Sequence, residues 1–223
     1  MMNFSCDLLL DLVIVLILLV AFQQFRTPEG ARRGNLTAGV ALACALLLVL
    51  LRQALFSPMV VAAAVAAGGA CGLLVALRVN MIQIPAMIAF QHGAGGIAAF
   101  LVSSVELARG AGQMAMLHEV SGVVGMIIGS ATFSGSMIAA GKLANRIRQT
   151  PQEISGHGWW MLGNGIAIAV TALVVLSMGP EALMIRYDLM ALIALSVSFG
   201  VLFSVRIGGA DMPVLISFLN ATA

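Results

Sequence analysis

The residue best able to do chemistry in this sequence is a histidine inside a strongly apolar stretch. His92 lies within IPAMIAFQHGAGGIAAFLV, residues 84–102, and is followed by Gly93, Gly95 and Gly96. Ionisable residues at membrane depth are costly, and they often mark proton or ion pathways. Imidazole titrates near neutral pH, so small changes around it can load or release a proton. Two interpretations stay open: a proton site, or a structural ring that bonds neighbouring carbonyls.

Small and hydroxylated residues surround this histidine at helical spacing. A spacing of three and four residues places side chains on one face of a helix. Two such faces occur, and the second contains a small-xxx-small pair that favours close helix packing in membranes. The members are His92, Gly96, Ala99 and Ser103 in the first face, and Ser121, Gly125, Gly129, Thr132 and Ser136 in the second.

The composition requires membrane helices to position these residues. The chain has 61% hydrophobic and 9% charged residues, with a mean hydropathy of +1.07. A soluble domain carries about a quarter charged residues, so we predict an integral membrane protein. The net charge of +2 gives no reason to expect a nucleic-acid partner. The three cysteines lack ligand spacing, so we expect small core residues and no metal site.

The apolar runs predict an all-α, polytopic transmembrane bundle with seven full spans and the start of an eighth at Met212. A crossing needs about 20 apolar residues. We expect the first run to be a retained span and not a cleaved leader. The stretches RTPEGARRGN and RIRQTPQEISGHG are expected to be loops. The predicted spans are 6–22, 36–55, 58–77, 84–105, 117–140, 160–178 and 188–205.

Basic residues predict the orientation of these spans. Loops rich in Lys and Arg stay in the cytoplasm, which places the N-terminus outside. The eight residues on the predicted cytoplasmic side are Arg26, Arg32, Arg33, Arg78, Lys142, Arg146, Arg148 and Arg206, against Arg52, Arg109 and Arg186 on the other.

Three polar side chains are predicted to lie at one membrane depth. At 1.5 Å per residue, His92 and Asn220 each lie about 12 Å from the cytoplasmic start of their helices. Ser136 lies about 10 Å above the cytoplasmic end of its own. If these helices are neighbours, the three side chains form a gated proton site.

The turn RIGGADMP, residues 206–213, precedes the last helix. Asp211 and Pro213 fit a helix N-terminus, with the aspartate as a cap. A charged contact with a partner domain is the alternative interpretation of Asp211.

Two other features are set aside. Gly93, Gly95 and Ala98 match G-x-G-x-x-A, but a dinucleotide site needs a preceding strand and a helix that starts at the glycines. His118 and His157 lie near predicted loop ends, where a solvated histidine is the simpler interpretation.

Three stretches resemble a known family. They are IAFQHGAGGIAA (88–99), IIGSATFSGSMIAAGKL (127–143) and IGGADMPVLISFLN (207–220). The chain is similar over nearly its whole length to the membrane domain of the β subunit of proton-translocating NAD(P) transhydrogenase. That family couples hydride transfer between NAD(H) and NADP(H), on two soluble domains, to proton passage through the membrane domain.

The resemblance implies roles for five residues. His92 is expected to relay protons together with Asn220 and Ser136, while Asp211 and Glu119 are expected to serve in coupling. It also implies partners: the transhydrogenase α subunit, the NADP-binding domain, and a dimer of the whole complex in the lipid of a bacterial inner membrane. No cofactor is expected on this chain, because NAD(H) and NADP(H) bind the partner domains.

The family's chain continues past the asparagine into further helices and an NADP-binding domain. We therefore expect residues 1–223 to form one transmembrane domain, with the nucleotide domain elsewhere on a longer or separately encoded chain. The alternative function is a non-catalytic membrane anchor or assembly subunit. A secondary transporter is less consistent, because no internal repeat is visible.

Overall fold

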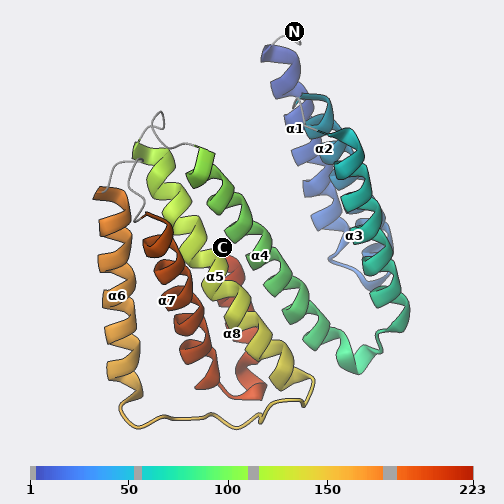
Figure 1. The fold of residues 1–223 in the computed structure, drawn as a ribbon. Coiled ribbons are helices and arrows are strands. Elements are labelled where there is room, and N and C mark those ends of the chain that lie inside the picture. The colour runs from blue at the N-terminus through green and yellow to red at the C-terminus, as the bar shows by residue number, and fades with distance from the viewer. Residues whose placement is uncertain (1–3, 53–56, 110–115, 178–184, 223) are drawn as a thin grey trace. The chain divides into compact units, whose positions relative to one another are not determined.

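A computed structural model describes residues 4–52, 57–109, 116–177 and 185–222, and in these ranges every regular element is helical (Figure 1). Short 3-10 turns precede two of the helices. The elements are α1 (Phe4–Gln24), α2 (Pro28–Arg52), α3 (Pro58–Arg78), η1 (Met81–Gln83), α4 (Ile84–Arg109), α5 (Met116–Leu143), α6 (His157–Ser177), α7 (Ile185–Val205), η2 (Gly209–Asp211) and α8 (Met212–Thr222).

Six of these helices, α2 to α7, are long and apolar enough to cross a membrane, and a shorter apolar helix covers Leu8–Gln24. The prediction of an all-α polytopic membrane protein is therefore confirmed. The number of seven full crossings stays a prediction.

The start of α2 corrects one predicted loop. The stretch RTPEGARRGN is largely helical, because α2 begins at Pro28 and not near residue 36. Proline suits the first position of a helix. The hydroxyl of Thr27 accepts the backbone N–H of Gly30 at 3.1 Å, as an N-cap does. The second stretch, residues 146–158, is non-helical as predicted except for its last two residues, His157 and Gly158, which begin α6.

The chain divides into two compact units, Met1–Leu77 and Arg78–Ala223. In the first unit α1 packs on α2, and both Ala21 and Ala41 are buried. The side chain of Thr37 donates to that of Gln24 at 3.0 Å. The prediction of one domain over residues 1–223 stays a prediction.

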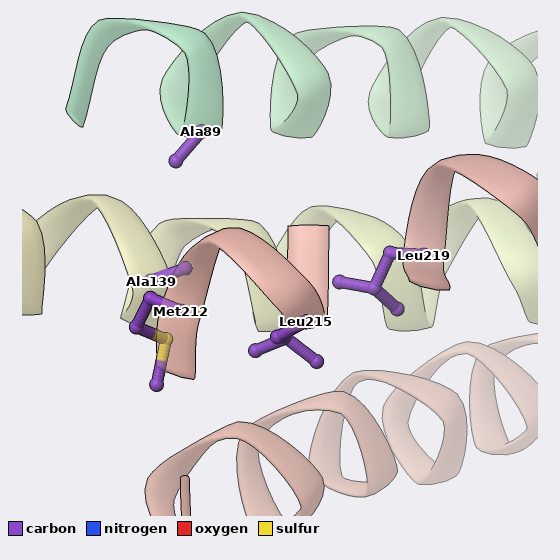
Figure 2. Packing of buried hydrophobic residues seen from close by; sticks show 5 residues of the cluster. All are labelled: Ala89, Ala139, Met212, Leu215 and Leu219. Atoms are coloured by element: carbon purple, nitrogen blue, oxygen red, sulfur yellow. The ribbon is translucent and has the colours of Figure 1, made fainter. Parts of the chain in front are cut away.

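Helix α5 is the centre of the second unit, since it contacts α4, α6, α7 and α8 (Figure 1). Two apolar clusters include residues of α5, one near its C-terminal end and one near its N-terminal end. Figure 2 shows the first, where α4, α5 and α8 meet. The first contains Ala89, Ala139, Met212, Leu215 and Leu219, and the second contains Val123, Met126, Ile168 and Leu192.

Helix α5 ends at Leu143 through a left-handed residue. Asn145 has φ of 57°, which asparagine tolerates better than most residues. The N–H of Arg146 then donates to the carbonyl of Gly141 at 2.9 Å. This closes the last turn of α5 and directs the chain into the loop that runs to α6.

Candidate functional site

His92 lies on α4 in the seam between α4 and α5. Its side chain is half-buried, and Nε2 is buried with no hydrogen-bond partner among the described residues. The next residue, Gly93, faces α5 so closely that a Cβ there would lie 3.2 Å from the Cβ of Ser136. The chain thus brings the histidine to the level of Ser136.

The seam continues through glycines that permit backbone contact. A Cβ on Gly96 would lie 2.8 Å from both the carbonyl oxygen of Gly129 and the nitrogen of Phe133. A Cβ built on Gly125 would have the hydroxyl of Ser103 as its nearest atom. The predicted packing of the two small-residue faces is confirmed at these positions. Gly95 has nothing within 4 Å of a built Cβ and does not contribute.

Not every member of the predicted faces lies in the seam. Ala99 is exposed, and Ser121 is exposed and returns its hydroxyl to its own helix, to the carbonyl of Leu117 at 2.9 Å. The fingerprint-like glycines lie inside α4, so they form no strand–loop–helix nucleotide motif.

Buried hydroxyl groups line α5 near the histidine. Ser136 is fully buried, and its hydroxyl has no hydrogen-bond partner among the described residues; the same is true of the hydroxyls of Ser130 and Ser204. Buried polar atoms in native proteins are nearly always paired with protein or water. Ser130 lies about 9 Å along α5 from Ser136, and Ser204 lies on α7, so Ser136 is the α5 hydroxyl at the level of the histidine. A hydroxyl both donates and accepts, so it can exchange protons with an imidazole.

Helix α8 reaches the same level, but with a different residue facing inward. Leu219 is buried, and its Cδ1 lies 3.3 Å from a Cβ built on Gly135. The adjacent Asn220 lies on the exposed side of α8. Within the described residues no hydrogen bond joins Asn220 to His92. The predicted common depth therefore agrees with the packing of α8, while the role of Asn220 stays a prediction.

The two coupling candidates lie away from the histidine. Asp211 ends η2 immediately before α8, and its side chain is exposed. Glu119 lies half-buried in the first turn of α5. Its distance from Ser136 along the helix is about 25 Å at 1.5 Å per residue. The structure places His92 and Ser136 at one level of the α4–α5 seam, because Gly93 packs against Ser136, and it places neither acidic residue beside them.

Lys142 is a buried residue that sequence reasoning assigned only to the basic cytoplasmic side. It is 0% exposed, and its Nζ donates to the carbonyls of Val205 at 2.7 Å and Ile207 at 2.6 Å. A third, longer bond of 3.3 Å goes to the carbonyl of Ser204. No sequence signal predicts this contact, because the partners lie more than 60 residues further along the chain.

Two further expectations are corrected by burial. His157 is 5% exposed at the start of α6, so it is not a solvated loop residue, whereas His118 is exposed as expected. Cys44 and Cys71 are free thiols on exposed helix faces, not core residues. Periodicity alone could reveal neither the burial of His157 nor the exposure of the two cysteines, because burial depends on which helices become neighbours.

These features define the class of the protein. It is a membrane-embedded helical bundle with a histidine and buried hydroxyl groups at a glycine-lined helix seam. A family model described as NAD(P) transhydrogenase beta subunit matches residues 8–223. The chain belongs to the NAD(P) transhydrogenase beta subunit family.

Relatives agree with this assignment. The chain is 34% identical over 228 aligned residues to NAD(P) transhydrogenase subunit beta of Rhodospirillum rubrum, an alignment that covers 99% of this chain and 48% of the relative. The same subunit from Rhodospirillum rubrum strain ATCC 11170 has the same identity and coverage. The chain thus spans about half the length of the curated relatives that it matches.

Proposed function

We propose that this chain is the proton-conducting membrane part of a proton-translocating NAD(P) transhydrogenase. Hydride passes from NADH to NADP+ on partner domains, and the membrane bundle couples that transfer to proton passage. The observation that carries the proposal is the buried, unpartnered Nε2 of His92 in the α4–α5 seam. Family membership supports the same function.

In this mechanism His92 accepts a proton from one side of the membrane and releases it to the other. The buried hydroxyl of Ser136 supplies a neighbouring donor and acceptor, and Asn220 is the further relay residue. One charge moved across 100 mV is worth about 2.3 kcal/mol. This energy is available to drive NADP+ reduction only if His92 is never open to both sides at once.

The exposed turn that contains Asp211 is where the NADP-binding domain acts on the bundle, and Glu119 lies on the opposite side. We place the end with Lys142 and Arg206 in the cytoplasm, the N-terminus outside, and the bundle in a bacterial inner membrane. NADP(H) and NAD(H) bind partner domains, the latter on the α subunit. The whole complex forms a dimer.

The test is His92→Ala in vesicles that contain the chain with its partner chains. We expect coupled proton uptake to fall roughly a hundredfold, as when a positioned acid–base group is removed. His118→Ala is the matched control, because His118 is exposed at the start of α5 and lies outside the seam. If His92→Ala retains coupled uptake, the histidine is structural, and a membrane anchor becomes the better function.

A further inference from the structure

The ammonium group of Lys142 has a complete set of hydrogen-bond partners. Its three protons meet three carbonyl oxygens, those of Ser204, Val205 and Ile207, at 3.3, 2.7 and 2.6 Å. A neutral amine has only two protons and could not donate to all three carbonyls. The arrangement therefore fits a charged ammonium group.

The location of these carbonyls explains why a charge is tolerated there. Ser204 and Val205 end α7, and the last carbonyls of a helix carry partial negative charge. Ile207 lies beyond the helix, in the turn that leads to η2 and α8. Lys142 thus joins the end of α5 both to the end of α7 and to the turn itself.

The loop after α5 holds the same turn from its other side. The side chain of Gln149 donates to Asn145 Oδ1 at 2.6 Å, and to the carbonyl of Lys142 at 3.3 Å. The carbonyl of Gln149 accepts the N–H of Gly209 at 2.8 Å, and the N–H of Gln152 donates to the carbonyl of Val205 at 3.2 Å. The turn 206–211 is therefore fastened to α5 through the lysine and through the loop.

Helix α5 continues from this attachment to the seam with α4. Ser136 lies six residues before Lys142, about 9 Å along the helix. Next to Ser136, α5 also touches α7, because a Cβ on Gly135 would lie 2.8 Å from the hydroxyl of Ser204. A displacement of the turn would consequently displace the segment of α5 around Ser136, which lies at the level of His92.

We propose that Lys142 is a positioning residue that ties the α7–α8 turn, with Asp211, to α5 and thereby transmits displacements of the turn to Ser136 and His92. The proposal rests on the proposed function, because it assigns Lys142 a part in coupling. A merely structural lysine would change only the amount of folded protein.

The first test compares Lys142→Met with Arg148→Met in the assembled complex in vesicles. Both variants remove one positive charge from the same end of the bundle, but Arg148 is exposed. Protons moved per hydride transferred should fall roughly fivefold or more in Lys142→Met and stay within about twofold in Arg148→Met. This ratio does not depend on how much protein folds. An unchanged ratio in Lys142→Met overturns the proposal.

The second test is hydrogen–deuterium exchange of the turn in the purified complex. The Gly209 N–H is held by the Gln149 carbonyl, so loss of the lysine should speed exchange in peptides that cover 206–211 by roughly tenfold. Arg148→Met should leave the rate unchanged. Equal exchange in wild type and Lys142→Met overturns the proposal even if transport is impaired.

Lys142→Arg provides a second variant if the methionine variant does not reach the membrane. It keeps the charge, but its planar fork cannot match three carbonyls arranged around one nitrogen. We expect a proton-to-hydride ratio and an exchange rate between those of wild type and Lys142→Met. Wild-type values for both overturn the proposal. A wild-type complex that transfers hydride without moving protons instead refutes the proposed function. The exchange comparison then still tests whether Lys142 holds the α7–α8 turn.

Discussion

Helices α3 and α5 are both long, apolar and rich in glycine, yet they pack differently. Their most apolar windows have mean hydropathies of 2.3 and 1.6, and half of the α5 window is buried compared with none of the α3 window. Gly68, Gly69 and Gly72 on α3 have nothing within 4 Å of a built Cβ. Four of the five glycines of α5 meet neighbouring helices instead, and the fifth, Gly141, meets Ile147 of the following loop. Glycine content alone therefore does not predict a packing face.

The difference follows from the residues between the glycines. Lipid is as apolar as leucine, so membrane helices associate through close backbone packing and interhelical polar contacts. Helix α5 adds Ser130, Thr132, Ser134, Ser136 and Lys142, all buried, to its glycines. Helix α3 consists mostly of alanine, valine, leucine and glycine, with no serine or threonine and with Arg78 in its last turn. Its surface gains nothing specific from a helix neighbour that lipid does not supply.

The largest effect is expected from filling the α4–α5 seam. In Gly96→Val the new side chain meets backbone atoms of Gly129 and Phe133, which cannot rotate away. We expect destabilisation of about 3 kcal/mol or more, with loss of coupled activity. The measurement is the folded fraction after heating in detergent, followed by size-exclusion chromatography.

Two controls sharpen this comparison. Gly95→Val places the same side chain one residue away on α4, and Gly69→Val places it on α3; neither position has an atom within 4 Å of a built Cβ. Both variants should keep the wild-type thermal profile. If Gly69→Val is as damaging as Gly96→Val, α3 has a packed face after all.

A smaller effect is expected between α5 and α7. In Gly200→Ala the methyl group would overlap the carbonyl of Ala131 and the hydroxyl of Ser134. The hydroxyl can turn away but the carbonyl cannot, so we expect a cost of about 1–3 kcal/mol. The same thermal assay measures it, with Gly68→Ala on α3 as the control. Equal stability of the two variants would contradict the α5–α7 contact.

The smallest effect is expected from Gly72→Ala on α3. Alanine favours helix over glycine by up to about 1 kcal/mol, and the added methyl group meets no neighbour. The variant should be as stable as wild type or slightly more stable in that assay. A loss of stability would show that α3 relies on close packing at this glycine.

Much of the architecture was predictable from the sequence. Six of the seven predicted spans match their helices to within about four residues, because apolar length reports membrane crossing, whereas α2 begins at Pro28, well before the predicted start at residue 36. The small-residue spacing on α4 and α5 identified the faces that meet at Gly96 and Gly129. Depth counting also placed His92 and Ser136 at one level, since helix rise converts residue number into height.

Other features could not be predicted because they depend on which helices are neighbours. The predicted faces included Ala99 and Ser121, which are exposed. The same kind of spacing also occurs on α3, in Gly68 and Gly72, where a built Cβ has nothing within 4 Å. The orientation of α8, with Leu219 buried and Asn220 exposed, is likewise fixed by contacts with α4 and α5. Helical periodicity describes a face but not its partner.

By itself, the sequence determined that this is a membrane helix bundle with a titratable histidine among glycines, because hydropathy and helix rise are local properties. Only the tertiary structure decided that Gly93, next to the histidine, packs against Ser136 and that Lys142 is buried. The lysine's acceptors are backbone carbonyls of α7 and the following turn. Backbone carbonyls are present at every residue, so their chemistry leaves no trace in the amino-acid pattern.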